Sequence, residues 1–200
     1  MLQWFRKIME YDKGKHSREQ IVQAGAAVVL AKGFAATTMA DLSHAANISS
    51  GKLTHHFPTK GSLFEAIYES LMTHMESGPL AALADTSLPP RDRIHGFLNG
   101  MYLLYARLQD PIGCPVGHAA GDSDGVSAAM KENAFKLLQR IISLFETTFR
   151  DLGEPPAIAL AKANLFVNLS QGAIVVARAG GGLEHLRKVF RDLKEIVDLS

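Results

Sequence analysis

Apolar residues recur at three- and four-residue spacing along most of this chain, and no stretch alternates apolar with polar residues between hairpin turns. This pattern predicts an all-α protein. We expect helices over residues 17–32, 39–46, 50–57, 60–76, 90–108, 126–152, 157–179 and 183–198. Two segments rich in Gly, Pro and Asp, 110–117 and 121–125, are expected to be loops.

Residues typical of helix ends mark several of these boundaries. Ser17 with Gln20 and Thr38 with Asp41 have the spacing of an N-cap and the third helical residue. Gly33 is expected to end the first helix.

The two long helices of the second half carry further signals. In 126–152 one apolar stripe is expected to face the core: Phe135, Leu138, Ile142, Phe145 and Phe149. The run Gly180-Gly181-Gly182 is expected to end helix 157–179. It lacks the preceding strand and the following Lys-Ser/Thr of a phosphate-binding P-loop.

Charge is distributed unevenly along the 200 residues. The formal net charge is only +1, but residues 1–60 hold eight Lys and Arg against four Asp and Glu, and residues 61–200 hold 13 against 16. Phosphate attraction needs local positive charge rather than a basic total. The basic N-terminal part therefore suits a DNA-binding domain, with the N-terminal stretch before the first helix interpreted as a flexible basic arm.

Composition also excludes several classes of protein. A hydrophobic fraction of 47% with 20% charged residues indicates a globular chain. The single cysteine, Cys114, allows no intramolecular disulfide and favours a reducing, cytoplasmic setting. No apolar run reaches the ~20 residues of a membrane span. The N-terminus lacks the apolar block of a signal peptide, and Met9 is an alternative start to Met1.

Two short helices, 39–46 and 50–56, joined by a turn at Asn47, have the proportions of a helix-turn-helix. The second helix carries apolar residues that would anchor it, Ile48, Leu53 and Phe57. Its remaining surface is polar and suits the major groove: Ser49, Ser50, Lys52, Thr54, His55 and His56. Thr38 and Lys60 flank the motif, where they could hold phosphates.

These residues resemble a known family. The stretch 18–67 is similar to the DNA-binding domain of TetR-type regulators at its diagnostic positions: Gly33-Phe34, Thr37-Thr38-Met39, Leu42, Ala45-Ala46, Ile48-Ser49, Gly51, Leu53, His56-Phe57, Lys60 and Leu63-Phe64. The resemblance implies an N-terminal three-helix DNA-binding domain, with its arm, over 1–62. A helical effector-binding and dimerisation domain would follow over 63–200.

The resemblance also implies a role for each matched position. Thr38 and Lys60 would bind phosphates. Ser50, Lys52 and His55 would face base edges, whereas Thr54 and His56 would lie against the backbone. Ser49 completes this set of DNA contacts. The family usually has Tyr where this chain has Thr54, so an aromatic phosphate contact is lost.

The second half resembles the family more weakly. Helices 157–179 and 183–198 hold the place of the dimer interface, and the first is rich in the small residues Ala161, Ala163, Gly172, Ala173 and Ala177. Gly113 to Gly117 resembles a Gly-Cys loop of LmrA/YxaF-like regulators. The expected effector pocket is lined by Phe97, Met101, Tyr102, Tyr105, Phe135, Phe145 and Phe166, with Asn168 or Gln171 as polar groups.

The function expected is that of a homodimeric repressor, without a cofactor, that a small lipophilic or electrophilic effector releases from a palindromic operator. An alternative is redox or electrophile sensing through Cys114, possible if His118 activates the thiol, against a purely structural buried cysteine.

An enzyme is not expected, because no catalytic constellation stands out. A helical interaction module that does not bind DNA is not expected either, because it would lack both the excess of basic residues in the N-terminal part and the polar reader helix. Adjacent His55 and His56 point about 100° apart on a helix and make poor joint metal ligands.

Overall fold

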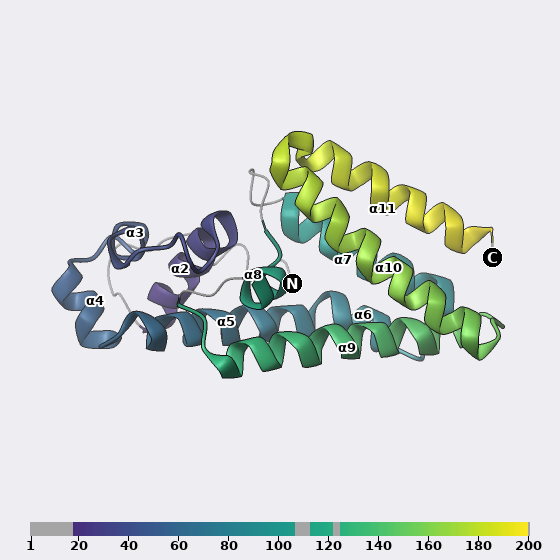
Figure 1. Cartoon of the computed structure of the whole chain (residues 1–200), viewed down its shortest axis with the longest axis horizontal. Helices are drawn as coiled ribbons and strands as arrows, with labels where there is room; N and C mark the ends of the chain where they lie inside the picture. The colour runs from purple at the N-terminus through teal and green to yellow at the C-terminus, as the bar shows by residue number, and fades with distance from the viewer. Residues whose placement is uncertain (1–17, 107–112, 122–124, 200) are drawn as a thin grey trace. The chain divides into compact units, whose positions relative to one another are not determined.

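The computed structural model describes residues 18–106, 113–121 and 125–199, whose regular structure is all helical, with no strand among them. The helices, shown in Figure 1, are α2 (Arg18–Lys32), α3 (Met39–Ala45), α4 (Ser50–His56), α5 (Lys60–Ser77), α6 (Pro79–Ala84), α7 (Pro90–Ala106), α8 (Pro115–Gly121), α9 (Ala128–Asp151), α10 (Pro156–Val176) and α11 (Gly182–Asp198). The all-α prediction is confirmed. Ser17 and the basic arm lie outside the described residues.

Two helices, α6 and α8, were not expected from the sequence. Both begin at a proline, Pro79 and Pro115. A proline is tolerated in the first helical turn because the N–H it lacks has no helical partner there. A proline that predicts the end of one helix can therefore also lie in the first turn of the next. Burial of Leu80 and Leu83 in α6, and of Val116 in α8, stabilises these short helices.

The chain divides into two compact units. The first comprises the described parts of residues 18–74 and 113–134, and the second those of 75–112 and 135–199. The first unit thus includes α8, which lies far along the sequence from α2. The N–H of Gly113 donates to the Leu30 carbonyl at 3.1 Å and so satisfies an acceptor in the last turn of α2. These units differ from the functional division expected at residue 62, which stays a prediction.

Aromatic rings form the centre of the first unit. Phe34 meets Phe64 edge to face, with ring centroids 5.2 Å apart, and lies 6.3 Å from Tyr68. All three side chains are buried. Because Phe34 follows α2, whereas Phe64 and Tyr68 belong to α5, this contact joins the start of the unit to the helix that follows the helix-turn-helix.

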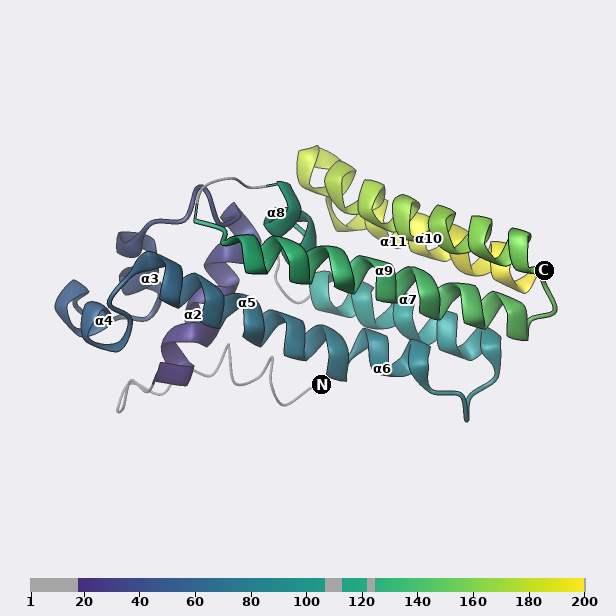
Figure 2. The ribbon, with the colours of Figure 1, turned by 60° about the horizontal axis from the view of Figure 1, so that its bottom comes forward.

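In the second unit, α7, α9 and α10 contribute a second aromatic cluster. Phe145 lies 5.0 Å from Phe97 and 5.8 Å from Phe166, and Phe149 lies 5.0 Å from Phe166. The pair α10 and α11 runs antiparallel, as Figures 1 and 2 both show. The chain reverses at a kink within Ala177–Gly181, at the expected glycine run. Gly180 there has φ 125°, a backbone conformation that favours glycine.

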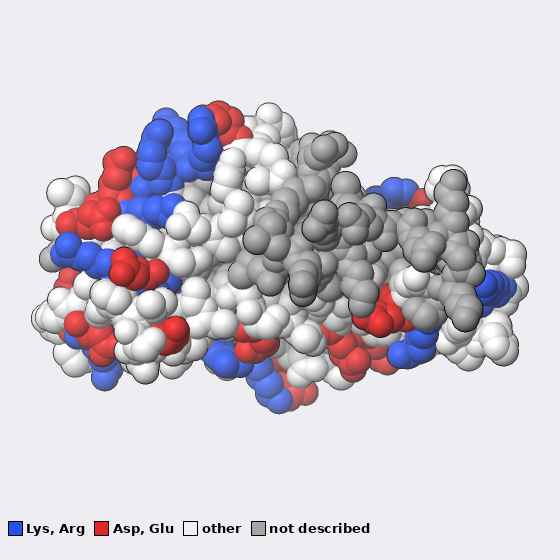
Figure 3. All heavy atoms as spheres, turned by 180° about the vertical axis from the view of Figure 1, so that it is seen from behind, with Lys and Arg blue, Asp and Glu red and all other residues white. Residues whose placement is uncertain are grey.

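The surface of the protein carries charges of both signs. On the described part of the face in Figure 3, Lys and Arg are interspersed with Asp and Glu. Exposed pairs on α11, such as Arg187 with Glu184 at 2.8 Å, follow helical spacing. A mixed surface of this kind favours solubility and contributes little to stability.

One predicted helix face is wrong. Phe135 in α9 is 60% exposed, and Leu138 and Ile142 are only half-buried. The buried stripe is a neighbouring one: Met130, Ala134, Leu137, Ile141, Phe145, Thr148 and Phe149. Both stripes have helical spacing and meet at Phe145 and Phe149. The structure buries the small Ala134 rather than the larger Phe135, which shifts the inward face by part of a turn.

Gly25 in α2 tests the packing of the first unit. A Cβ there would lie 2.6 Å from Ile67 Cδ1 and 3.0 Å from Leu42 Cδ2, and both neighbours are fully buried. We expect Gly25→Val to lower the free energy of unfolding by about 1–3 kcal/mol through overpacking, measured by urea denaturation. Gly51→Val is the control, because a Cβ at Gly51 meets nothing within 4 Å. Equal stability of the two variants would contradict this close approach.

Candidate nucleic-acid interface

The helix-turn-helix is built from α3, α4 and a tight turn. Asn47 adopts φ 49°, a left-handed conformation that Asn tolerates well, and the Ile48 N–H donates to the Ser43 carbonyl at 3.0 Å. Leu42 of α3 and Leu53 of α4 are buried together with Phe57, which follows α4. These contacts hold α4 by its apolar side, and its other side faces solvent.

The exposed side of α4 is polar, as predicted. Ser49 is the N-cap, since its hydroxyl accepts from the Lys52 N–H at 3.3 Å. The Thr54 hydroxyl donates to the Ser50 carbonyl at 2.8 Å, so its hydrogen is already engaged within the helix. The exposed residues are Ser49, Ser50, Gly51, Lys52, Thr54 and His55, with His56 half-buried.

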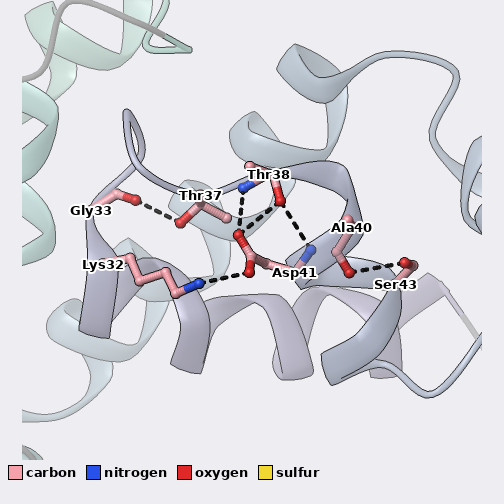
Figure 4. A network of polar contacts seen from close by, with 7 residues as sticks. All are labelled: Lys32, Gly33, Thr37, Thr38, Ala40, Asp41 and Ser43. Atoms are coloured by element: carbon pink, nitrogen blue, oxygen red, sulfur yellow. Dashed lines mark hydrogen bonds and ion pairs between the residues drawn. The ribbon is translucent and has the colours of Figure 1, made fainter.

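A network of hydrogen bonds fixes the start of α3 (Figure 4). The N–H and the hydroxyl of Thr38 donate to Asp41 Oδ2 at 2.9 Å and 2.8 Å, and the Asp41 N–H donates back to the Thr38 hydroxyl at 3.1 Å. Thr38 is thus the N-cap predicted from the sequence, and its reciprocal bonds with Asp41 make a capping box. Lys32 at the end of α2 completes it, with its ammonium 2.6 Å from Asp41 Oδ1.

These partners have two consequences. The Lys32 ammonium, followed by the Thr38 donors, holds the pKa of the Asp41 carboxyl well below its usual range. Asp41 therefore contributes fully to stability above its unfolded-state pKa, and this contribution is lost progressively as the pH falls from there through the lowered pKa of the folded state. Both donors of Thr38 are engaged by Asp41, so neither is available for another acceptor while the box is closed.

Two cations lie over aromatic rings at the edges of the motif. Lys60 Nζ is 5.0 Å from the centroid of Phe64, and Arg18 Cζ is 4.6 Å from that of Phe57. The sequence singled out Lys60 but not Arg18, which counted only toward the basic total. Arg18 and Phe57 are far apart in the chain, and their pairing has no local signature.

The residues expected around an effector do not share one environment. Phe97, Met101, Tyr105, Phe145 and Phe166 are buried, whereas Tyr102 and Gln171 are half-buried and Asn168 and Phe135 are exposed. The Ser170 hydroxyl, which the sequence did not single out, is buried and has no hydrogen-bond partner among the described residues. A single serine in an apolar helix does not indicate from the sequence that its hydroxyl will be buried.

Cys114 lies just before α8 and is 6% exposed. Within the part of the chain that the structure describes, the hydroxyl of buried Tyr68 has no hydrogen-bond partner. Burial, with proximity to Cys114, raises the pKa of Tyr68 to about 12. Burial of Cys114 limits the access of an oxidant to its thiol. This supports the structural interpretation of Cys114 over the sensor alternative, which stays a prediction. Among the described residues, no group of three or more His, Cys, Asp or Glu could hold a metal ion.

Family models match both halves of the chain. The bacterial regulatory protein model of the TetR family matches residues 21–67, and that of the LmrA/YxaF-like transcriptional regulator C-terminal domain matches residues 90–192, more than half of the chain. This chain belongs to the TetR family. Members of this family are DNA-binding transcriptional regulators rather than enzymes.

Individual relatives are distant but consistent. A TetR regulator from Legionella pneumophila superposes with a TM-score of 0.77 at 20% identity, over 92% of this chain and 99% of that one. AibR, solved with isovaleryl coenzyme A and operator DNA, gives 0.66 at 15% identity over 90% of this chain and 96% of that one. The repressor DhaR from Mycobacterium sp. (strain GP1) is 19% identical over 64% of this chain and 63% of its own length. The match thus spans less than two thirds of that relative.

The capping box offers a test of how α3 is held. Thr38→Val removes the hydroxyl that caps the helix, and we expect the free energy of unfolding to fall by about 0.5–2 kcal/mol. Thr38→Ser keeps the hydroxyl and should stay close to the wild type. Urea denaturation followed by circular dichroism measures both. If Val and Ser are equally stable, the capping hydrogen bonds of Thr38 do not contribute.

Proposed function

We propose that this TetR-family regulator is a repressor, which binds a palindromic operator as a homodimer and leaves it when a small lipophilic or electrophilic effector binds. The observation that carries the proposal is α4, a short helix anchored by buried Leu53 and polar on its exposed side. A helix presented in this way suits the major groove.

The DNA contacts divide by the kind of group they meet. On α4, Ser50, Lys52 and His55 read base edges, and Ser49, Thr54 and His56 lie near the backbone. Lys60 binds a phosphate with its ammonium. At Thr38 the phosphate meets the first-turn N–H groups of α3, because the donors of Thr38 itself are engaged by Asp41. Phosphate contacts position the protein, and base contacts give specificity.

The homodimer forms through α10 in this proposal. Ile158, Leu165, Leu169 and Val176 are exposed and follow one face of α10, beside the small residues Ala161 and Gly172. Segment 156–198 contains a stretch apolar and long enough to cross a membrane by composition, and 39% of that stretch is buried. A second copy of α10 and α11 would bury the exposed apolar face and form a four-helix interface.

The effector is proposed to bind in the second half of the chain, beside the buried aromatic residues Phe97, Phe145 and Phe166. These side chains suit a lipophilic ligand. The buried, unpartnered Ser170 hydroxyl would provide a hydrogen bond to it. An effector releases the operator to the extent that it binds the two conformations of the regulator with different affinity.

Two lysine variants test the DNA contacts, with fluorescence anisotropy of the protein on its own upstream intergenic DNA. Lys60→Ala should weaken binding to operator and random DNA alike and lower the salt-dependence slope by about 0.9, the value for one phosphate contact. Lys52→Ala should relax the preference for the operator by about 1–3 kcal/mol. If neither variant changes operator affinity, the assignment of the reader helix is wrong.

Leu165, which is 51% exposed, tests the dimer. Leu165→Glu would bury an unpaired carboxylate in the interface, and at a cost of about 3 kcal/mol or more it should weaken dimerisation at least a hundredfold. Light scattering after gel filtration measures the mass. Leu88→Glu is the control, since Leu88 is 39% exposed and lies outside α10 and α11. A Leu165→Glu variant that stays dimeric would exclude this face as the interface.

A further inference from the structure

Gly125 comes just before α9, far along the sequence from the helix-turn-helix, yet it belongs to the same compact unit as α5. A Cβ at Gly125 would lie 2.6 Å from Phe64 Cε2, 2.9 Å from Phe64 Cδ2 and 3.6 Å from Lys60 Cε. The backbone of Gly125 therefore lies directly against the edge of the Phe64 ring and beside the end of the Lys60 side chain.

The Phe64 ring cannot readily move away from this contact. It is fully buried, and Phe34 meets it edge to face with centroids 5.2 Å apart. Its face in turn holds the Lys60 ammonium, whose Nζ is 5.0 Å from the ring centroid. The position of Lys60 thus depends on the Phe64 ring. The edge of this ring has room only for a residue without a side chain, and Gly125 lies there.

This arrangement matters for DNA binding because a lysine is flexible. Fixing a free lysine side chain on a phosphate costs conformational entropy, and that cost weakens binding. A lysine that already lies on an aromatic ring has lost part of this freedom in the unbound protein. Its ammonium can then meet the phosphate at a smaller cost.

We propose that Gly125 is a positioning residue for DNA binding: its lack of a side chain lets the Phe64 ring hold Lys60 ready for a backbone phosphate. The inference rests on the proposed phosphate contact of Lys60. It extends the DNA-binding machinery to a residue outside the helix-turn-helix and outside the matched region 21–67. The φ of 74° at Gly125 further restricts the position to glycine.

The test compares two alanine variants, both at glycines whose φ is positive. Gly125→Ala introduces the clash with Phe64. Gly153→Ala is the matched control, because Gly153 has φ 96° but a Cβ there meets nothing within 4 Å. The probe is a mixed-sequence DNA duplex, since phosphate contacts do not depend on sequence. Its affinity is measured by fluorescence anisotropy over a range of salt concentrations, after circular dichroism has established that each variant is folded.

We expect the added methyl to tilt the Phe64 ring and carry the Lys60 ammonium out of reach of the phosphate. Gly125→Ala should then bind about three- to tenfold more weakly and lose most of the salt-slope unit that Lys60→Ala loses, about 0.9. The double variant Lys60→Ala/Gly125→Ala should bind no more weakly than Lys60→Ala alone, because both changes remove one contact. Gly153→Ala should match the wild type. A merely structural role of Gly125 would leave the salt slope unchanged.

The outcomes separate this inference from the proposed function. If Lys60→Ala weakens binding but Gly125→Ala does not, or if the two losses add, the positioning role is overturned and the phosphate contact stands. If Lys60→Ala changes neither affinity nor slope, both fail. Should Gly125→Ala not fold, Phe64→Leu replaces it: loss of the ring should lower the slope without adding to Lys60→Ala, and an unchanged slope overturns the proposal.

Discussion

The burial of Leu53 and Phe57 is the constraint on which the DNA-binding half depends. A helix of seven residues such as α4 has almost no stability of its own in water, because few hydrogen bonds offset the cost of its nucleation. Its apolar contacts and the Ser49 cap must provide that stability. The exposed side chains of Lys52 and His55 take no part in this capping or core packing, so their identity can follow the DNA sequence to be recognised. The same division holds in α3, where Leu42 is buried and the Thr38–Asp41 box closes the N-terminus.

A different constraint governs α10, which is apolar on nearly every side. Its inner face packs with the aromatic cluster through Phe166, while Leu165 and Val176 on the outer face are exposed in the single chain. A helix that is hydrophobic all round is stable in water only when it is buried all round. The small residues of α10 serve both faces, since Ala163 and Ala173 are buried and Ala161 and Gly172 are exposed. α10 thus contributes one face to the core of the second unit and the opposite face to the proposed homodimer.

Sequence signals predicted the local structure well where the determining residues are neighbours. Thr38 with Asp41 and the turn at Asn47 are short-range features, and the structure has each of them. The prediction failed where the decision is made by distant residues. Whether Ala134 or Phe135 of α9 faces inward depends on what packs against it, and Pro115 begins a helix only because Val116 and its neighbours find a core. The sequence did not predict the pairing of Arg18 with Phe57 either, because a contact between residues far apart in the chain leaves no periodic pattern in the sequence.

The least predictable feature is the membership of residues 113–134 in the first unit, and it has the widest consequence. Two backbone positions attach this segment to the helices around the motif: the Gly113 N–H bonds to the last turn of α2, and Gly125 lies on the ring of Phe64 in α5. Neither contact uses a side chain of the segment, so both demand close backbone approach and tolerate little displacement. Any movement of 113–134 relative to α2 and α5 must break the hydrogen bond to Leu30 and withdraw Gly125 from Phe64.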